Sequence, residues 1–214
     1  MISQGKNILE ILERLSITLS GSQLKTINEY VNILFQWHDI HNIVSTRDIE
    51  YFLRRDFYDS LAASKHIKGD ELLDVGTGAG IPGLLLALIR NDRKVHLLDR
   101  RENAIRFLEH VKLRLKIENI IIANQDIEKY KSNMNIEGVV IKNYSNKITS
   151  KLSYDKKIAY LVNLIRKNFI NVPIYFITGA SSLLLKKNFI FDVNVTKIET
   201  EFFDTNRYIL EIKS

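Results

Sequence analysis

Cysteine is absent from this chain of 214 residues, and proline occurs only twice. Without a thiol, the sequence excludes disulfide frameworks, zinc ribbons, iron–sulfur clusters and cysteine nucleophiles. Long apolar runs are lacking too, because no stretch approaches the roughly 18 residues of a membrane-spanning helix. Residues 1–6 also lack the continuous apolar segment of a secretory signal. We therefore expect a cytoplasmic protein.

The net charge and the histidine content exclude only a few classes of function. Lys and Arg number 31 against 25 Asp and Glu, so the formal net charge is +6. Such an excess is compatible with a polyanion partner such as nucleic acid without requiring one. The histidines lack the spacing of a metal site, and we interpret them as structural or surface residues: His38, His41, His66, His96 and His110.

The first 68 residues have the pattern of a helical extension. Apolar residues recur at helical spacing in three stretches, which are 8–15, 24–37 and 48–66. Ser20 or Ser22 is a plausible N-cap for the second helix. We therefore assign residues 1–68 to a helical N-terminal extension.

After Gly69 the pattern changes to short apolar runs that alternate with amphipathic helices. The predicted strands are 71–75, 95–99, 120–123, 138–141, 174–178, 193–198 and 208–212. The predicted helices are 82–89, 102–115 and 156–169, with a weaker one after Ser181. This alternation predicts a doubly wound α/β domain over 69–214 with a mostly parallel, seven-stranded sheet. The short polar segment 199–207 cannot hold a crossover helix, so the last two strands should form an antiparallel hairpin at one edge.

A glycine-rich loop follows the first predicted strand. The strand ends at Asp74 and Val75, glycines recur at Gly76, Gly78 and Gly80, and a helix starts near Pro82. Glycines permit positive φ and let a ligand approach the backbone closely. A strand, a glycine loop and a helix in this order indicate a ligand-binding loop, although such turns also occur where nothing binds.

Two cofactor classes compete for this loop. The spacing Gly78-x-Gly80-x-x-Gly83 satisfies the dinucleotide fingerprint, which leaves an NAD-binding oxidoreductase as one alternative. Asp99 ends the second strand and can accept hydrogen bonds from a ribose in either case, or can cap the next helix. Asp74 separates the two classes, because a carboxylate there repels a pyrophosphate but favours the cationic S-adenosyl-L-methionine. We therefore favour S-adenosyl-L-methionine.

Several segments resemble one family of enzymes. These segments are 37–45, the triplet Asp59-Ser60-Leu61, the loop 74–83, the triplet Leu97-Leu98-Asp99, the triplet Arg106-Phe107-Leu108 and the pair Asn119-Ile120. In these segments the sequence resembles the bacterial 16S ribosomal RNA guanine-N7 methyltransferases, the glucose-inhibited-division protein B family. The resemblance implies a class I (Rossmann-like) methyltransferase fold with a helical extension, and a monomer that methylates guanine N7 in 16S ribosomal RNA.

The methyl-donor site is predicted from two sources. The resemblance assigns to it Gly76, Ile81, Ile127, Glu128 and Lys142. The residue pattern adds Asp74, Gly78 and Asp99. The segment 124–128 after the third strand suits an adenine contact, with an ordinary acidic turn as the alternative.

The chemistry requires few catalytic groups. Guanine N7 carries a free lone pair, so a methyl transfer to it needs no strong general base. Catalysis would then come from orientation, and Lys142 is a candidate positioning residue only. We expect the RNA to be held by Arg54, Arg55, Arg100, Arg101, Arg106, Lys142 and Lys147, with Tyr144 as a stacking residue.

Some positions depart from the family pattern. Asp56 stands where the resemblance predicts His, Asp126 where it predicts Arg, and Ile141-Lys142-Asn143 where it predicts Ser-Arg-Ala. A basic pair is replaced by Asn103-Ala104 and a Lys-Gly pair by Thr178-Gly179. Lysine also lacks the bidentate geometry of arginine. These departures motivate a further alternative, a degenerate methyltransferase fold that binds RNA or ribosomal particles without turnover.

Overall fold

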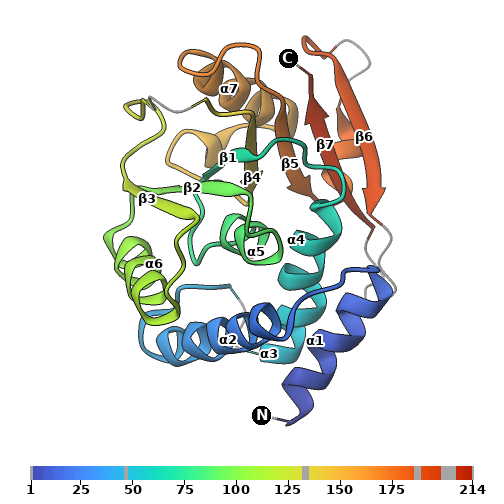
Figure 1. The fold of residues 1–214 in the computed structure, drawn as a ribbon. Coiled ribbons are helices and arrows are strands. Elements are labelled where there is room, and N and C mark those ends of the chain that lie inside the picture. Colours follow the sequence, from blue (N-terminus) through green and yellow to red (C-terminus); the bar gives the residue numbers. More distant parts are fainter. Residues whose placement is uncertain (1, 46–47, 132–134, 186–188, 199–205, 214) are drawn as a thin grey trace.

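The protein is built around one central sheet. The computed structural model describes residues 2–45, 48–131, 135–185, 189–198 and 206–213. Seven strands lie in the order β3-β2-β1-β4-β5-β7-β6 (Figure 1). Their bounds are β1 (Glu71–Val75), β2 (Lys94–Asp99), β3 (Ile120–Asn124), β4 (Gly138–Lys142), β5 (Ile174–Thr178), β6 (Val193–Ile198) and β7 (Arg207–Ile212).

The strand pairing confirms the predicted architecture. The neighbours from β3 to β5 pair in parallel, whereas β7 pairs antiparallel with both β5 and β6. The strands β1, β5 and β6 have the predicted bounds, and each other strand is one residue longer at one end. One of these added residues is Lys142, which pairs with Ile177 of β5 as the last residue of β4.

Helices cover both faces of the sheet. Their bounds are α1 (Ile2–Arg14), α2 (Gly21–His41), α3 (Ile49–Phe52), α4 (Tyr58–Ala63), α5 (Gly83–Ile89), α6 (Glu102–Leu115) and α7 (Tyr154–Arg166). Alternate strand residues point to opposite faces. Leu72, Val95 and Val140 belong to the core shared with α5, α6 and the N-terminal helices. Leu73 and Val139 belong to the core shared with α7.

The N-terminal helices pack directly on the sheet unit. Their buried residues and those of α5 and α6 form one apolar cluster. The Tyr30 hydroxyl on α2 donates a hydrogen bond to the carbonyl oxygen of Ala79 in the glycine loop, at 2.8 Å. The division of the chain after residue 68 stays a prediction. None of the described helices is both long and apolar enough to cross a membrane.

The expected helical stretch over 48–66 is confirmed from Ile49 to Ala63, but it is not one continuous α-helix. The structure has α3, a π-helical turn over Leu53–Phe57, and then α4. Ser60 Oγ donates a 2.6 Å hydrogen bond to the carbonyl oxygen of Asp56, and such a serine contact bends or widens a helical turn. The π-helical turn gives Asp56 a buried position.

Other helix predictions need smaller corrections. Ser20 caps α2 and forms a capping box with Gln23. The last long helix, α7, begins and ends earlier than the predicted 156–169. The weak helix after Ser181 is a short 3₁₀ turn over Ala180–Leu184, too short to cover the sheet.

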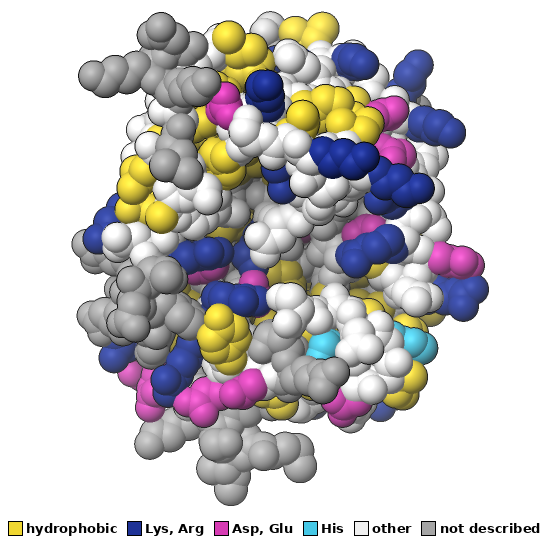
Figure 2. Space-filling view, turned by 180° about the vertical axis from the view of Figure 1, so that it is seen from behind, with side chains coloured by type: hydrophobic (Ala, Val, Ile, Leu, Met, Phe, Trp, Pro, Cys, Tyr) yellow, Lys and Arg dark blue, Asp and Glu magenta, His cyan; other side chains and the backbone are white. Residues whose placement is uncertain are grey.

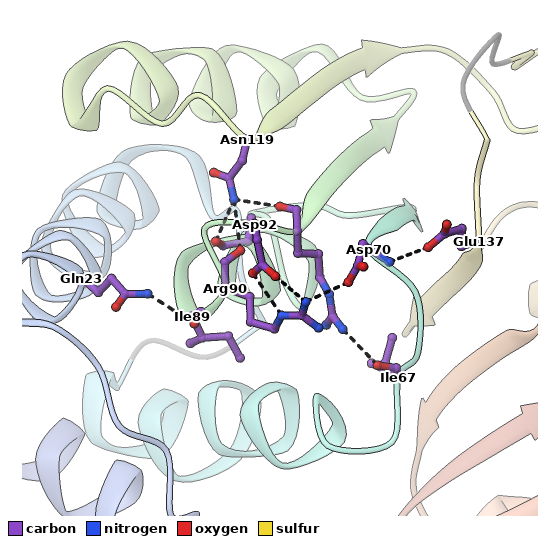
Figure 3. Close-up of polar contacts among 10 residues, drawn as sticks. Gln23, Ile67, Asp70, Ile89, Arg90, Asp92, Asn119 and Glu137 are labelled. Atoms are coloured by element: carbon purple, nitrogen blue, oxygen red, sulfur yellow. Dashed lines mark hydrogen bonds and ion pairs between the residues drawn. The ribbon is translucent and has the colours of Figure 1, made fainter.

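A polar network fastens the turn between α5 and β2 (Figure 3). Asn119 Nδ2 donates to the carbonyl oxygens of Ala87 and Arg93, at 2.9 and 2.8 Å. Arg90 Nη2 pairs with carboxylate oxygens of Asp70 and Asp92, at 2.8 and 2.6 Å. Asn119, one of the residues that carry the family resemblance, therefore has a structural role.

Candidate functional site

A cavity lies at the carboxyl ends of the central strands. In this sheet order the chain turns away in opposite directions from β1 and β4, which leaves a crevice between their ends. The residues that line the cavity are Val75, Gly76, Leu98, Asp99, Arg100, Arg101, Gln125, Asp126, Ile127, Asn143, Tyr144 and Ser145. We call it the central cavity. Figure 2 shows the side opposite to that of Figure 1, where the surface is hollowed near its centre and Lys and Arg side chains border the hollow.

Gly76, the first residue of the glycine loop, lines the central cavity. Its φ is +74°, and a Cβ there would lie 2.7 Å from Cδ2 of Tyr144. Its N–H donates to the carbonyl oxygen of Leu98 at 2.8 Å, which fixes the loop to β2. Both the backbone conformation and the contact with Tyr144 therefore require glycine.

Asp74 lies beneath the loop and does not line the central cavity. Its Oδ2 accepts hydrogen bonds from Thr77 Oγ1 at 2.6 Å and from the N–H of Gly83 at 2.8 Å. Burial raises the pKa of Asp74 to about 7, against the lowering effect of these two hydrogen bonds. The carboxyl group therefore ties β1 to the start of α5, and a direct contact with a ligand stays a prediction.

Asp99 ends β2 with its carboxylate at the wall of the central cavity. Its Oδ2 accepts from the N–H of Gly78 at 2.9 Å, and its Oδ1 accepts from the N–H of Arg101 at 2.9 Å. The Arg101 guanidinium lies over both oxygens at 3.2 Å. The first residue of α6 is Glu102, so Asp99 holds the two loops rather than capping that helix.

The other predicted donor contacts lie in different places. Ile127 is buried and lines the central cavity. The Glu128 side chain points elsewhere, because its Oε1 accepts from the Tyr160 hydroxyl at 3.2 Å. Ile81 lines a neighbouring cavity together with Gly78.

This neighbouring cavity lies between the segment after α2, the π-helical turn and the glycine loop. We call it the front cavity; it is lined by Ile43, Val44, Ser45, Asp56, Gly76, Thr77, Gly78, Ala79, Ile81, Arg101, Lys142 and Asn143. Lys142 Nζ and Asp56 form a buried ion pair there, and Arg55 Nη2 reaches the other carboxylate oxygen at 2.7 Å. Burial acts to raise the pKa of Asp56, but Lys142 and Arg55 outweigh it and hold that pKa below its usual value.

The Lys142–Asp56 pair changes two predictions. The Lys142 side chain is only 3% exposed, so it cannot serve as a surface cation for RNA, as was expected. Asp56 appeared in the sequence only as a departure from the family pattern, yet it lines the front cavity. The presence of Asp56 where the family pattern has histidine does not indicate that its carboxylate will contact Lys142, which is far along the chain.

The structure brings together only some of the predicted RNA-binding residues. Arg100, Arg101 and Tyr144 line the central cavity. The guanidinium groups of Arg54 and Arg106 form ion pairs with Glu50 and Glu102 along their own helical segments. Lys147 is exposed and lines neither the central cavity nor the front cavity.

Comparison with known proteins identifies relatives. The family model described as GidB, rRNA small subunit methyltransferase G, matches residues 23–168. The protein named ribosomal RNA small subunit methyltransferase G from Shewanella baltica is 34% identical over 135 residues, which cover 63% of this chain and 66% of that protein. Its namesake from a Marinomonas species is 36% identical over 118 residues, which cover 55% and 57%. The chain thus spans just under two thirds of the length of the first relative.

A solved structure supports the fold. Magnesium protoporphyrin IX methyltransferase from Synechocystis PCC 6803 superimposes with a TM-score of 0.53 at 12% identity, over 86% of this chain and 97% of that one. The class I methyltransferase fold predicted from the sequence is therefore confirmed. Because the family model matches more than half of the sequence, the chain belongs to the GidB family, the rRNA small subunit methyltransferases G.

Proposed function

We propose that this protein transfers a methyl group from S-adenosyl-L-methionine to N7 of a guanine in 16S ribosomal RNA, as a cytoplasmic monomer. One observation carries the proposal: in a member of the GidB family, the bare backbone of Gly76 and the carboxylate of Asp99 face the same cavity at the ends of β1 and β2. A nucleoside with a ribose diol suits such a pair of features.

The residues present fit S-adenosyl-L-methionine, which supplies an electrophilic methyl group when bound. Asp99 would accept from the ribose hydroxyls in place of the guanidinium of Arg101, whose side chain is 61% exposed and can turn away. Ile127 provides an apolar contact for a flat base. The loop beside Gly76 has no Cβ to block a close approach.

The same loop is poorly suited to a dinucleotide. A pyrophosphate needs free N–H groups at a helix start. Here the N–H of Gly83, the first residue of α5, already donates to Asp74 at 2.8 Å, and that carboxyl group would repel a phosphate when ionised. This arrangement favours the methyl donor over NAD.

The protein's own residues act by positioning. Guanine N7 needs no deprotonation, so the reaction requires alignment rather than a base. Tyr144 lies against Gly76 and lines the central cavity, where its ring could stack on a base. The Lys142–Asp56 pair fixes the end of β4 next to Gly76. Arg100 and Arg101 at the cavity edge attract phosphates.

The decisive experiment is mass mapping of N7-methylguanosine in 16S ribosomal RNA from cells with and without the gene. We expect one such mark to disappear in the deletion strain and to return when the purified protein and S-adenosyl-L-methionine are added to its small-subunit RNA or particles. Persistence of every mark in the deletion strain would refute the substrate assignment. A protein that binds these RNAs but never methylates them would be the non-catalytic alternative.

A further inference from the structure

A third cavity lies beside the end of β4, and apart from Tyr144 its lining residues have no role in the function proposed above. We call it the rear cavity. Its floor is apolar and consists of Ile141, Ile158, Leu161, Phe176 and Ile177 from β4, α7 and β5. Its polar lining consists of Asn143, Tyr144, Tyr154, Lys157 and Thr178. An apolar floor with a few polar groups is typical of a site for a flat organic ligand.

The rear cavity adjoins the central cavity. Asn143 and Tyr144 line both, so these two residues lie at the boundary between the cavities. Asn143 has a φ of +56°, which turns the chain sharply after β4 and places the two residues at this junction. A base stacked on Tyr144 would therefore lie at the junction of the two cavities, with its Hoogsteen edge across it.

Lys157 is an unusual cation in this setting. It lies on the first turn of α7 and is partly buried, and within the described part of the chain no carboxylate or other acceptor pairs with its ammonium group. By contrast, the Tyr154 hydroxyl is engaged with Thr178 Oγ1 at 3.1 Å. Burial lowers the pKa of Lys157. A partly desolvated ammonium without an acceptor is suited to a ligand that supplies one.

The Hoogsteen edge of guanine supplies such an acceptor. Guanine carries O6 next to N7, whereas adenine carries an amino donor at the same place. The rear cavity has an apolar floor and the Lys157 side chain in its lining, so it can receive the edge of a base that carries an acceptor. With N7 facing the central cavity, O6 on the same edge would be directed past Tyr144 toward Lys157.

We propose that Lys157 donates a hydrogen bond to O6 of the target guanine and so selects guanine over adenine. This inference rests on the proposed function, because it names the residue that recognises the base to be methylated. An RNA phosphate is the other acceptor that an ammonium can bind, and the experiment distinguishes the two.

The test is a cycle that combines one protein change with one RNA change. The methylated guanosine, once located by mass mapping, is replaced by 2-aminopurine, which keeps N7 and the N2 amino group but lacks O6. Transfer to both RNAs is measured for the wild type, for Lys157→Met and for the matched control Lys156→Met, an exposed neighbour on α7. Calorimetry checks that S-adenosyl-L-methionine still binds each variant.

We expect either single change to lower kcat/KM by roughly 10- to 100-fold, the usual effect of a lost charged hydrogen bond. The combined change should cost little more than one change alone, because both remove the same contact. Lys157→Arg, which keeps a donor, should retain part of the preference for guanine, and Lys156→Met should behave like the wild type.

Two results would overturn the inference. Losses that multiply in the combined change mean that Lys157 and O6 act independently, as expected for a phosphate contact. An unchanged kcat/KM of Lys157→Met on guanine RNA means that Lys157 has no part in recognition. Failure of the proposed function itself would appear in the wild-type arm, which would then form no N7-methylguanosine, and both proposals would fall.

Discussion

Lys142 and Asp56 form a buried ion pair that joins the last residue of β4 to the π-helical turn in the N-terminal extension. Both residues depart from the family resemblance, which predicts Arg and His at these positions. The two departures therefore meet in space. Lys142 keeps a cation at the end of β4, and Asp56 provides an anion that pairs with it where the family pattern has His.

Replacing Asp56 by Asn should destabilise the fold strongly. The change leaves the Lys142 ammonium buried without a counter-charge, which typically costs about 3–5 kcal/mol. Lys142→Met should cost less, because Asp56 keeps Arg55 as a partner. The double variant should lose less than the sum of the two. Urea unfolding at pH 7 measures these differences, with Asp92→Asn on the exposed turn as the control.

The effect should also depend on pH. The pKa of Asp56 is lowered in the folded state, so its charge stabilises the fold above the unfolded pKa of about 4. This contribution is lost as the pH falls through the lower, folded-state pKa. The gap between wild type and Asp56→Asn should therefore shrink in acid, and a gap that is constant with pH would contradict the ion pair.

Gly76→Val should abolish binding of S-adenosyl-L-methionine. A Cβ at this position would lie 2.7 Å from the Tyr144 ring, and a φ of +74° is strained for a branched residue. Calorimetry measures the affinity, and circular dichroism checks the fold. Gly21→Ala is the control, because a Cβ there has open space. An unchanged affinity in Gly76→Val would refute the assignment of the loop.

Asp99→Ala should weaken donor binding by about 1.5–3 kcal/mol, the usual contribution of hydrogen bonds to a charged group. Asp99 also holds the N–H of Gly78, so thermal unfolding must show that the loss is not a general loss of stability. Asp126→Ala, in the same cavity, provides the comparison. Tight binding of NADH together with no binding of S-adenosyl-L-methionine would instead support the dinucleotide alternative.

The sheet could be predicted from the sequence because its signals are local. Strands buried on both faces appear as short apolar runs, and the bounds of β1 and β5 follow directly from them. The cap at Ser20 and the loop glycines are likewise set by nearby residues. The antiparallel edge followed from a connection too short for a crossover helix.

The site was harder to predict because it depends on contacts between distant segments. A helical pattern over 48–66 cannot show that a π-helical turn will bury Asp56 beside Lys142. The position of Glu128 shortly after β3 does not predict that its side chain accepts a hydrogen bond from Tyr160. No motif in the sequence points to Lys157, and only the packing of α7 against β4 and β5 places it in the rear cavity.

Asp74 should make the stability of the protein fall between about pH 4 and pH 7. Burial raises its pKa to about 7, so in this range the folded state retains a proton that the unfolded state has released. Asp74→Asn keeps an acceptor for Thr77 and Gly83 but cannot ionise. The variant should lose less stability than the wild type between about pH 4 and pH 7, by on the order of a few kcal/mol. Urea unfolding measures this, with the exposed Asp39→Asn as control. Equal losses in all three proteins would show that Asp74 stays ionised beneath the loop.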